Sequence, residues 1–161
     1  YGLLAKQIVS LAEVDAHWLP VLSNAAALLW DALDDINWAG FYLVDSATVT
    51  GGGSSTPELR LGPFQGKVAC VRISYGRGVC GTAAATKTSQ LVEDVHQFPG
   101  HIACDSASNS EVVVPIFKDG QVVGVLDIDS PNVARFTQED LAGLEQVVKA
   151  LESCTNFSAF C

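Results

Sequence analysis

A thiol and a carboxylate flank a short polar segment in the middle of the chain. The run HIACDSASNSEV, residues 101–112, carries Cys104 and brings Glu111 to the start of an apolar stretch. Its small polar residues predict a surface loop. An exposed thiol can meet a substrate, and once it is oxidised it needs a partner that resolves it. We therefore take Cys104 as the candidate for a reactive thiol.

Two further cysteines precede this loop. Cys70 lies in KVACVRI, a strand-like run in which a cysteine is as often a small buried side chain as a reactive one. Cys80 lies in GVCG near a predicted helix start, where the positive end of the helix dipole favours a thiolate. Three thiols are enough to form and resolve an oxidised intermediate, but spacing alone does not bring them together.

Three acids belong to the predicted terminal hairpin. Asp127 and Asp129 are two residues apart, so in a strand they share a face. A turn at residues 119–120 places Glu111 opposite Asp129. Gathered carboxylates repel unless they meet a cation or share a proton. The cluster could bind an ammonium group, hold a metal or keep one acid protonated as a proton donor. Alternatively, the strand ends at Asp127 and the acids are solvated turn residues.

Aromatic and histidine residues supply weaker signals. Trp38 and Tyr42 share a strand face, and they are either core residues or the wall of a pocket. His101 and Cys104 form an H-x-x-C step, which without a second Cys/His pair is a weak indication of metal. The remaining histidines are predicted as surface or capping residues: His17 and His96.

The composition excludes several classes of protein. The 161 residues are 48% apolar and 17% charged, which predicts a globular chain with one core. A net charge of −9 argues against nucleic-acid binding, and no apolar run approaches the length of a membrane span. The odd number of cysteines, five, without a secretory signal pattern, favours reduced thiols and a cytoplasmic protein.

Hydrophobic periodicity predicts an α+β fold, with an antiparallel central sheet covered on one face by helices from both chain ends. We expect a single domain over 1–161, with a flexible Gly/Ser-rich loop at 45–57 and a tail at 154–161 whose two cysteines are incidental. Helices are predicted over 3–13, 18–33, 76–87 and 136–153, the last capped by Thr137 and Asp140. Strands are predicted over 37–45, 58–64, 67–73, 111–117 and 121–129, and 89–95 as a short strand or turn.

The motifs NWAGFYL, GRGVCGTAA, PGHIACDS, SEVVVPI and GVLDIDS occur in this order. Together they resemble the free methionine-(R)-sulfoxide reductases, single-domain enzymes of the GAF fold, over roughly residues 3–151. The resemblance implies that Cys104 attacks the sulfoxide sulfur and becomes a sulfenic acid. Cys70 would condense with it to a disulfide that thioredoxin reduces. Cys80 matches a third family cysteine that relays the disulfide, and whether Cys70 or Cys80 resolves the sulfenic acid stays open.

The same resemblance assigns the other site residues. Glu111, Asp127 and Asp129 match acids that surround the sulfoxide and amino groups, with Glu111 or Asp129 as the proton donor. Trp38 and Tyr42 match aromatics that hold the methyl-sulfur end and exclude peptides. No cofactor or metal is implied. The expected partners are free methionine-(R)-sulfoxide, a thioredoxin-like reductant and a second copy of the chain in a homodimer.

A different class of function is a sensor: a GAF module that binds a small ligand without catalysis, its cysteines being structural. A cyclic-nucleotide sensor of this fold would be expected to carry an Asn-Lys dipeptide, and the sequence has none. A redox switch that binds metal through His101 and Cys104 is a third, weaker alternative.

Overall fold

The computed structural model describes residues 1–45, 56–101 and 106–160, with only the backbone for 159–160. Most of the predicted 45–57 loop and residues 102–105 of the HIACDSASNSEV segment, including Cys104, lie outside the described residues, as does Cys161. In chain order the elements are α1 (Gly2–Ala12), α2 (Trp18–Ala32), β1 (Trp38–Val44), β2 (Glu58–Gly66), β3 (Arg72–Ser74), α4 (Gly78–Thr86), β4 (Gln90–Val92), η1 (Val95–Gln97), β5 (Ser110–Lys118), β6 (Gln121–Ser130), α5 (Gln138–Cys154) and η2 (Phe157–Phe160).

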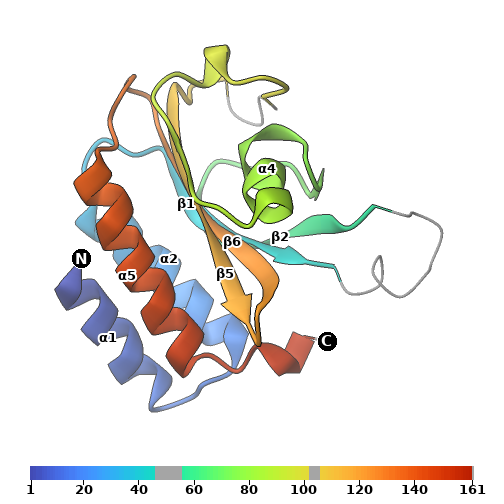
Figure 1. Ribbon diagram of the computed structural model, residues 1–161. Helices are drawn as coiled ribbons and strands as arrows, with labels where there is room; N and C mark the ends of the chain where they lie inside the picture. The colour runs from blue at the N-terminus through green and yellow to red at the C-terminus, as the bar shows by residue number, and fades with distance from the viewer. Residues whose placement is uncertain (46–55, 102–105, 161) are drawn as a thin grey trace.

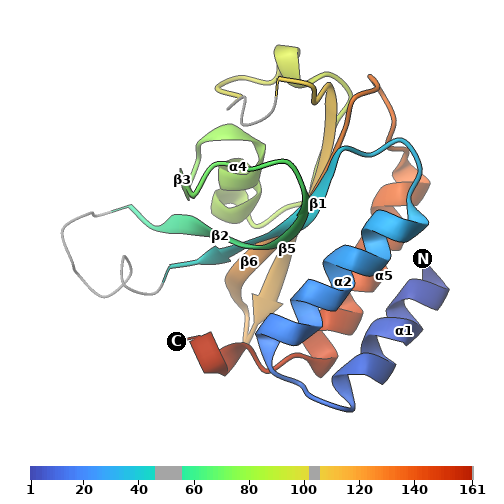
Figure 2. The same cartoon turned by 180° about the vertical axis from the view of Figure 1, so that it is seen from behind.

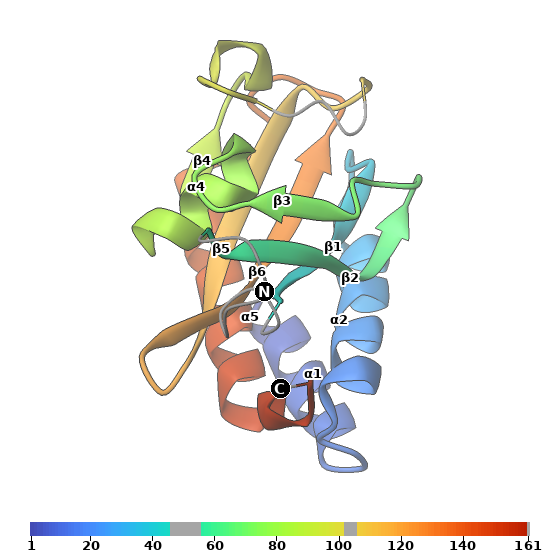
Figure 3. The same ribbon diagram turned by 90° about the vertical axis from the view of Figure 1, so that its right-hand side faces the viewer.

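One antiparallel sheet has the strand order β3-β2-β1-β6-β5-β4. Helices α1, α2 and α5 cover one face, and α1 and α5, from opposite ends of the chain, lie side by side (Figures 1 and 2). The α+β prediction is confirmed. The prediction that helices from both chain ends cover one face of the sheet is also confirmed. The opposite face carries α4, as the view from that side shows (Figure 3).

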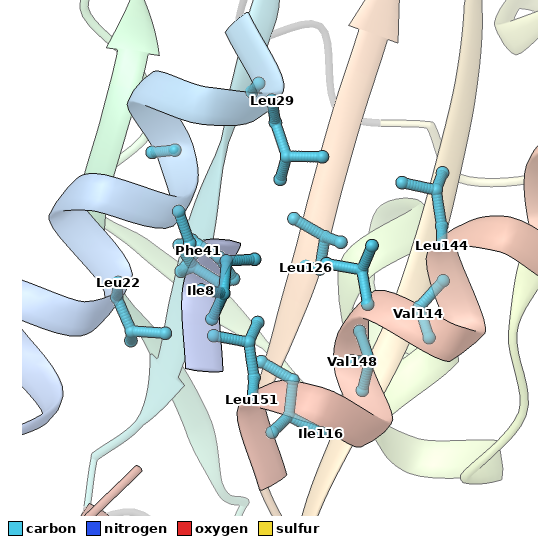
Figure 4. Packing of buried hydrophobic residues seen from close by; sticks show 14 of the residues in the cluster. Ile8, Leu22, Leu29, Phe41, Val114, Ile116, Leu126, Leu144, Val148 and Leu151 are labelled. Carbon is cyan, nitrogen blue, oxygen red and sulfur yellow. The ribbon is translucent and has the colours of Figure 1, made fainter. Parts of the chain in front are cut away.

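The main core lies between the sheet and the three long helices. Side chains that alternate along β1, β5 and β6 point to this face, among them Phe41, Val114 and Leu126 (Figure 4). Leu22 and Leu29 of α2 meet them without any exposed surface. Truncating one such leucine to alanine removes packing worth about 2–5 kcal/mol of unfolding free energy. Successive side chains of a strand point to opposite faces of the sheet. The residues that alternate with these core residues therefore point to the other face, where they form the floor of the site.

Local signals fix the ends of the elements that carry the site. Thr137 and Asp140 form the predicted capping box at the start of α5. His17 caps α2 through a hydrogen bond that its ring accepts from Leu19 N. The β5–β6 hairpin turns at Asp119 and Gly120, whose φ angles of 50° and 75° fit a type I′ turn. These predictions are confirmed.

The segment of residues 67–71 is not the strand that its apolar composition predicts. Side chains of β1 bind its backbone instead: Trp38 Nε1 donates to the carbonyl oxygen of Lys67 and Tyr42 Oη donates to that of Cys70. These two carbonyl groups therefore accept hydrogen bonds from side chains on the sheet face and not from the backbone of a neighbouring strand. The segment lies across the face of the sheet at these positions. The strand begins only at Arg72.

Within the described residues, none of the helices combines the length and the apolar composition that a membrane crossing requires.

Candidate active site

The hairpin brings the three acids to one sheet face. Glu111 of β5 pairs in register with Asp129 of β6, and Asp129 pairs on its other side with Trp38 of β1. Asp127 lies two residues before Asp129 and shares its face. Because β6 continues to Ser130, the interpretation of the acids as solvated residues beyond a strand end is wrong.

These residues line a cavity between the sheet and α4. The sheet contributes the acids and the aromatic pair Trp38 and Tyr42, while α4 and the segment before β3 form the opposite side. The full lining of the described residues is Trp38, Tyr42, Val68, Ala69, Ile73, Arg77, Gly78, Val79, Cys80, His101, Ser108, Glu111, Asp127 and Asp129. Trp38 and Tyr42 both line this cavity, and they also belong to the buried cluster on this face of the sheet.

A thiol and two carboxylates meet at the floor of the cavity. The Sγ atom of Cys80 lies 3.9 Å from Oε1 of Glu111, and these groups and a carboxylate oxygen of Asp127 all lie within 4.8 Å of one another. The three residues are only 3%, 6% and 5% exposed, respectively. Oδ1 of Asp127 is buried and has no hydrogen-bond partner among the described residues. Such a cluster can hold an ammonium group or a metal cation.

Burial controls the protonation of these acids. It raises the pKa of Glu111 well above its ordinary value, and the negative charges of Asp127 and Asp129 raise it further. Burial also raises the pKa of Asp127, to about 6. The pair therefore favours a neutral Glu111 beside a largely ionised Asp127 at neutral pH. A carboxylic acid held neutral in this way can donate a proton to a reacting oxygen.

Cys80 behaves differently from its sequence prediction. It is the third residue of α4, but burial raises the pKa of its thiol well above the ordinary value, and Asp127 and Glu111 add to the effect. The low-dielectric surroundings and two nearby acids outweigh the helix dipole. The prediction that the helix start favours a Cys80 thiolate is therefore wrong, and the residue is a buried, protonated thiol.

The aromatic wall is held rigidly. The rings of Trp38 and Tyr42 stack with centroids 5.8 Å apart, and Phe64 stacks on Trp38 at 5.2 Å. Gly40 leaves the room that Phe64 occupies, because a Cβ atom there would lie 2.3 Å from the Phe64 Cβ. Burial raises the pKa of Tyr42, so its hydroxyl remains a donor to the Cys70 carbonyl oxygen, 3.0 Å away.

Cys70 is half-buried and disulfide-bonded, and neither Cys80 nor Cys154 is its partner, because both are free. Cys104, the predicted attacking thiol, lies outside the described residues.

Two polar lining residues, Arg77 and Ser108, have no role in the sequence prediction of the site, and a third, His101, has one only in the weak metal-binding alternative with Cys104. Burial, with the neighbouring His96, lowers the pKa of His101, which therefore favours the neutral ring. Ser108 accepts a hydrogen bond from Asn37 Nδ2. Arg77 stands directly before the GVCG motif, and this position is the one signal by which the sequence could have indicated it.

Known proteins share this architecture along nearly the whole chain. The GAF domain family matches residues 6–154. The free methionine-R-sulfoxide reductase of Escherichia coli K12 is 52% identical over 152 residues, 94% of this chain and 86% of that protein. The structure of fRMsr of Staphylococcus aureus in complex with substrate is 52% identical, has a TM-score of 0.85 and covers 97% of this chain and 95% of its own.

A second structure, free methionine-R-sulfoxide reductase from Neisseria meningitidis in complex with its substrate, is 44% identical with a TM-score of 0.86. The similarity covers 98% of this chain and 87% of that one. The chain belongs to the GAF-domain family and, within it, to the free methionine-R-sulfoxide reductases.

Proposed function

We propose that this protein is an oxidoreductase that reduces free L-methionine-(R)-sulfoxide to L-methionine, with cysteine thiols as the electron source. The observation that carries the proposal is the cavity itself. It combines a neutral acid at Glu111 with a rigid aromatic wall, in a chain 52% identical to a reductase of this name. These are the groups that a polar sulfoxide and its apolar methyl end require.

Each chemical group of the substrate has a matching group among the residues that line the cavity. Its methyl-sulfur end packs against Trp38 and Tyr42, and its sulfoxide oxygen accepts a proton from Glu111. Its ammonium group meets Asp127 and Asp129, which line the same cavity. An uncharged acid is needed at the oxygen because the sulfoxide oxygen leaves sulfur readily only after protonation.

We propose that Cys104 supplies the attacking sulfur. Its thiolate bonds to the sulfoxide sulfur, and the oxygen passes to the cysteine, which becomes a sulfenic acid while methionine is released. The substrate sulfur gains two electrons and the cysteine sulfur loses two. A second thiol then displaces water from the sulfenic acid and forms a disulfide. An external dithiol of the thioredoxin type reduces this disulfide and is itself oxidised.

Cys70 is the better candidate for the second thiol. It is disulfide-bonded, and its carbonyl oxygen accepts a hydrogen bond from Tyr42, which lines the cavity. Cys80 is free, buried and protonated, so it attacks poorly. We assign Cys80 to the acid cluster, where its thiol approaches Glu111. The cytoplasmic location and the homodimer stay predictions.

A coupled assay tests the function. With thioredoxin, thioredoxin reductase and NADPH, the protein should consume NADPH on addition of free L-methionine-(R)-sulfoxide. The S epimer and a peptide-bound sulfoxide should give much lower rates. Absence of turnover together with tight binding of a nucleotide would favour the ligand-binding sensor instead.

A further inference from the structure

Three groups that can each carry a negative charge meet at the floor of the cavity: the thiol of Cys80 and the carboxyl groups of Glu111 and Asp127. The ion pairs in the described part of the chain involve other acids: Asp45, Glu58 and Asp140. The Oδ1 atom of Asp127 is buried and accepts no hydrogen bond from the described residues. A buried carboxylate oxygen without a partner is costly, so it indicates a place for a positively charged ligand.

The three donor atoms suit a zinc ion. Thiolate sulfur and carboxylate oxygen are both common zinc ligands, and a thiolate favours zinc over magnesium or calcium. In a tetrahedral site with ordinary bond lengths, a sulfur and an oxygen ligand lie about 3.6 Å apart. The Sγ atom of Cys80 is 3.9 Å from Oε1 of Glu111, and a carboxylate oxygen of Asp127 lies within 4.8 Å of both atoms. Small rotations of these side chains are therefore enough to bring all three atoms to one ion.

Regular elements hold the three ligands in place. Cys80 belongs to α4, Glu111 to β5 and Asp127 to β6. Cys80 packs in a buried apolar cluster that includes Val113 and Val125 of these two strands. An apolar shell of this kind lowers the local dielectric constant and strengthens the attraction between a cation and its ligands. Three protein ligands leave one position of a tetrahedral ion for a water molecule of the cavity that the same residues line.

We propose that Cys80, Glu111 and Asp127 form a zinc site whose occupation inhibits the protein. Zn²⁺ bonds to the sulfur and to one oxygen of each carboxylate, while the protons of the thiol and of Glu111 pass to water. No group is oxidised or reduced. The inhibition, but not the binding, rests on the proposed function. The ion removes the proton of Glu111 and neutralises Asp127, which the sulfoxide oxygen and the ammonium group of the substrate need. Zinc and substrate therefore exclude each other.

Calorimetric titration with zinc chloride tests the site in the disulfide form of the protein, in which Cys70 is bonded and Cys80 is free. We expect one ion per chain. Cys80→Ser and Asp127→Asn should each weaken binding at least about tenfold, because even an outer-shell partner of a metal site contributes 10- to 100-fold. The matched controls Cys154→Ser and Asp119→Asn change a free thiol and an exposed acid outside the cavity lining, and both should bind zinc like the unmutated chain. Circular dichroism checks that each variant is folded.

Cobalt(II) in place of zinc identifies the sulfur ligand. The unmutated chain should show the charge-transfer absorption of a cobalt-bound thiolate, and Cys80→Ser should not. Zinc binding or a cobalt spectrum that Cys80→Ser leaves unchanged overturns the site.

Competition locates the ion in the cavity. L-Methionine, the proposed product, should weaken zinc binding more than an equal concentration of glycine, which chelates zinc through the same two groups but has no side chain to pack against Trp38 and Tyr42. Equal weakening by the two amino acids overturns the mutual exclusion. Zinc at saturation should also slow methionine release in one turnover of the reduced protein, and an unchanged rate overturns the inhibition. If the chain binds zinc through Cys80 but reduces no sulfoxide, the proposed function fails and the zinc site stands.

Discussion

The Tyr42 hydroxyl donates a hydrogen bond to the backbone carbonyl oxygen of Cys70 at 3.0 Å. Tyr42 is part of the cavity wall, whereas Cys70 carries the disulfide-bonded sulfur. The bond therefore joins the place where the substrate methyl group is expected to pack to the segment that is proposed to resolve the sulfenic acid. Trp38 supports the same segment through the Lys67 carbonyl, at 3.2 Å.

Tyr42→Phe keeps the ring and removes this hydrogen bond. In a single turnover we expect methionine to form at nearly the unmutated rate and the disulfide to form roughly fivefold more slowly, because a bond worth about 1 kcal/mol no longer positions Cys70. Quenched samples analysed for methionine and for free thiols separate the two steps. The control is Tyr75→Phe, a half-buried tyrosine outside the cavity lining. Equal slowing of both steps would assign Tyr42 to substrate binding alone.

Glu111→Gln keeps the shape of the side chain and removes the transferable proton. Turnover should fall at least about a hundredfold, within the range that general acid catalysis contributes. The fold should persist, because an uncharged amide replaces an acid that already favours its neutral form. Steady-state rates and circular dichroism measure both effects, with Glu93→Gln, an exposed position, as the control. Turnover unchanged by Glu111→Gln would place the proton donor elsewhere, with Asp129 as the next candidate.

The free energy of unfolding should fall as the pH rises through the range in which the buried acids ionise. The folded-state pKa of Asp127 is raised to about 6, so folding favours the protonated form. Its contribution is complete below the ordinary pKa of an aspartate and is lost as pH rises through 6. Urea unfolding should therefore give a free energy lower at pH 7.5 than at pH 4.5, by about 2 kcal/mol from this group.

Asp127→Asn should reduce this dependence by the share that Asp127 contributes, because the amide does not titrate whereas Glu111 still does. The control Asp119→Asn changes an exposed turn residue and should keep the unmutated slope. If Asp127→Asn retains the full decrease in stability between the two pH values, then burial of Asp127 is not its cause.

Cys80 should resist alkylation in the folded, reduced protein. Its thiol is 3% exposed and burial raises its pKa, so little thiolate is present or reachable. Cys154 serves as the internal reference, since it is half-buried and free. Mass spectrometry after a short iodoacetamide pulse should find Cys80 labelled far less than Cys154, and equal labelling only after denaturation. Rapid labelling of Cys80 in the folded state would restore it as a candidate nucleophile.

The acid cluster could be predicted from the sequence because its formation depends on features that lie close together in the chain. The period of two and the Asp-Gly turn are sufficient to place Glu111 opposite Asp129, and the pair is found in register. The interpretation of Cys70 as a strand residue fails because Trp38 and Tyr42 bind that segment from 29 and 28 residues away. Propensity contains no information about such contacts. The raised pKa of Cys80, where a thiolate was predicted, also results from contacts between distant parts of the chain. It depends on acids that lie 31 or more residues later.

One turnover without an external reductant tests the proposed chemistry most directly. Reduced protein mixed with free L-methionine-(R)-sulfoxide should release one methionine per chain and gain one disulfide, which peptide mapping should assign to Cys70 and Cys104. The Cys104→Ser variant should release none. Methionine released by Cys104→Ser, or a stoichiometric burst without that disulfide, would contradict the proposed attack by Cys104 and its resolution by Cys70.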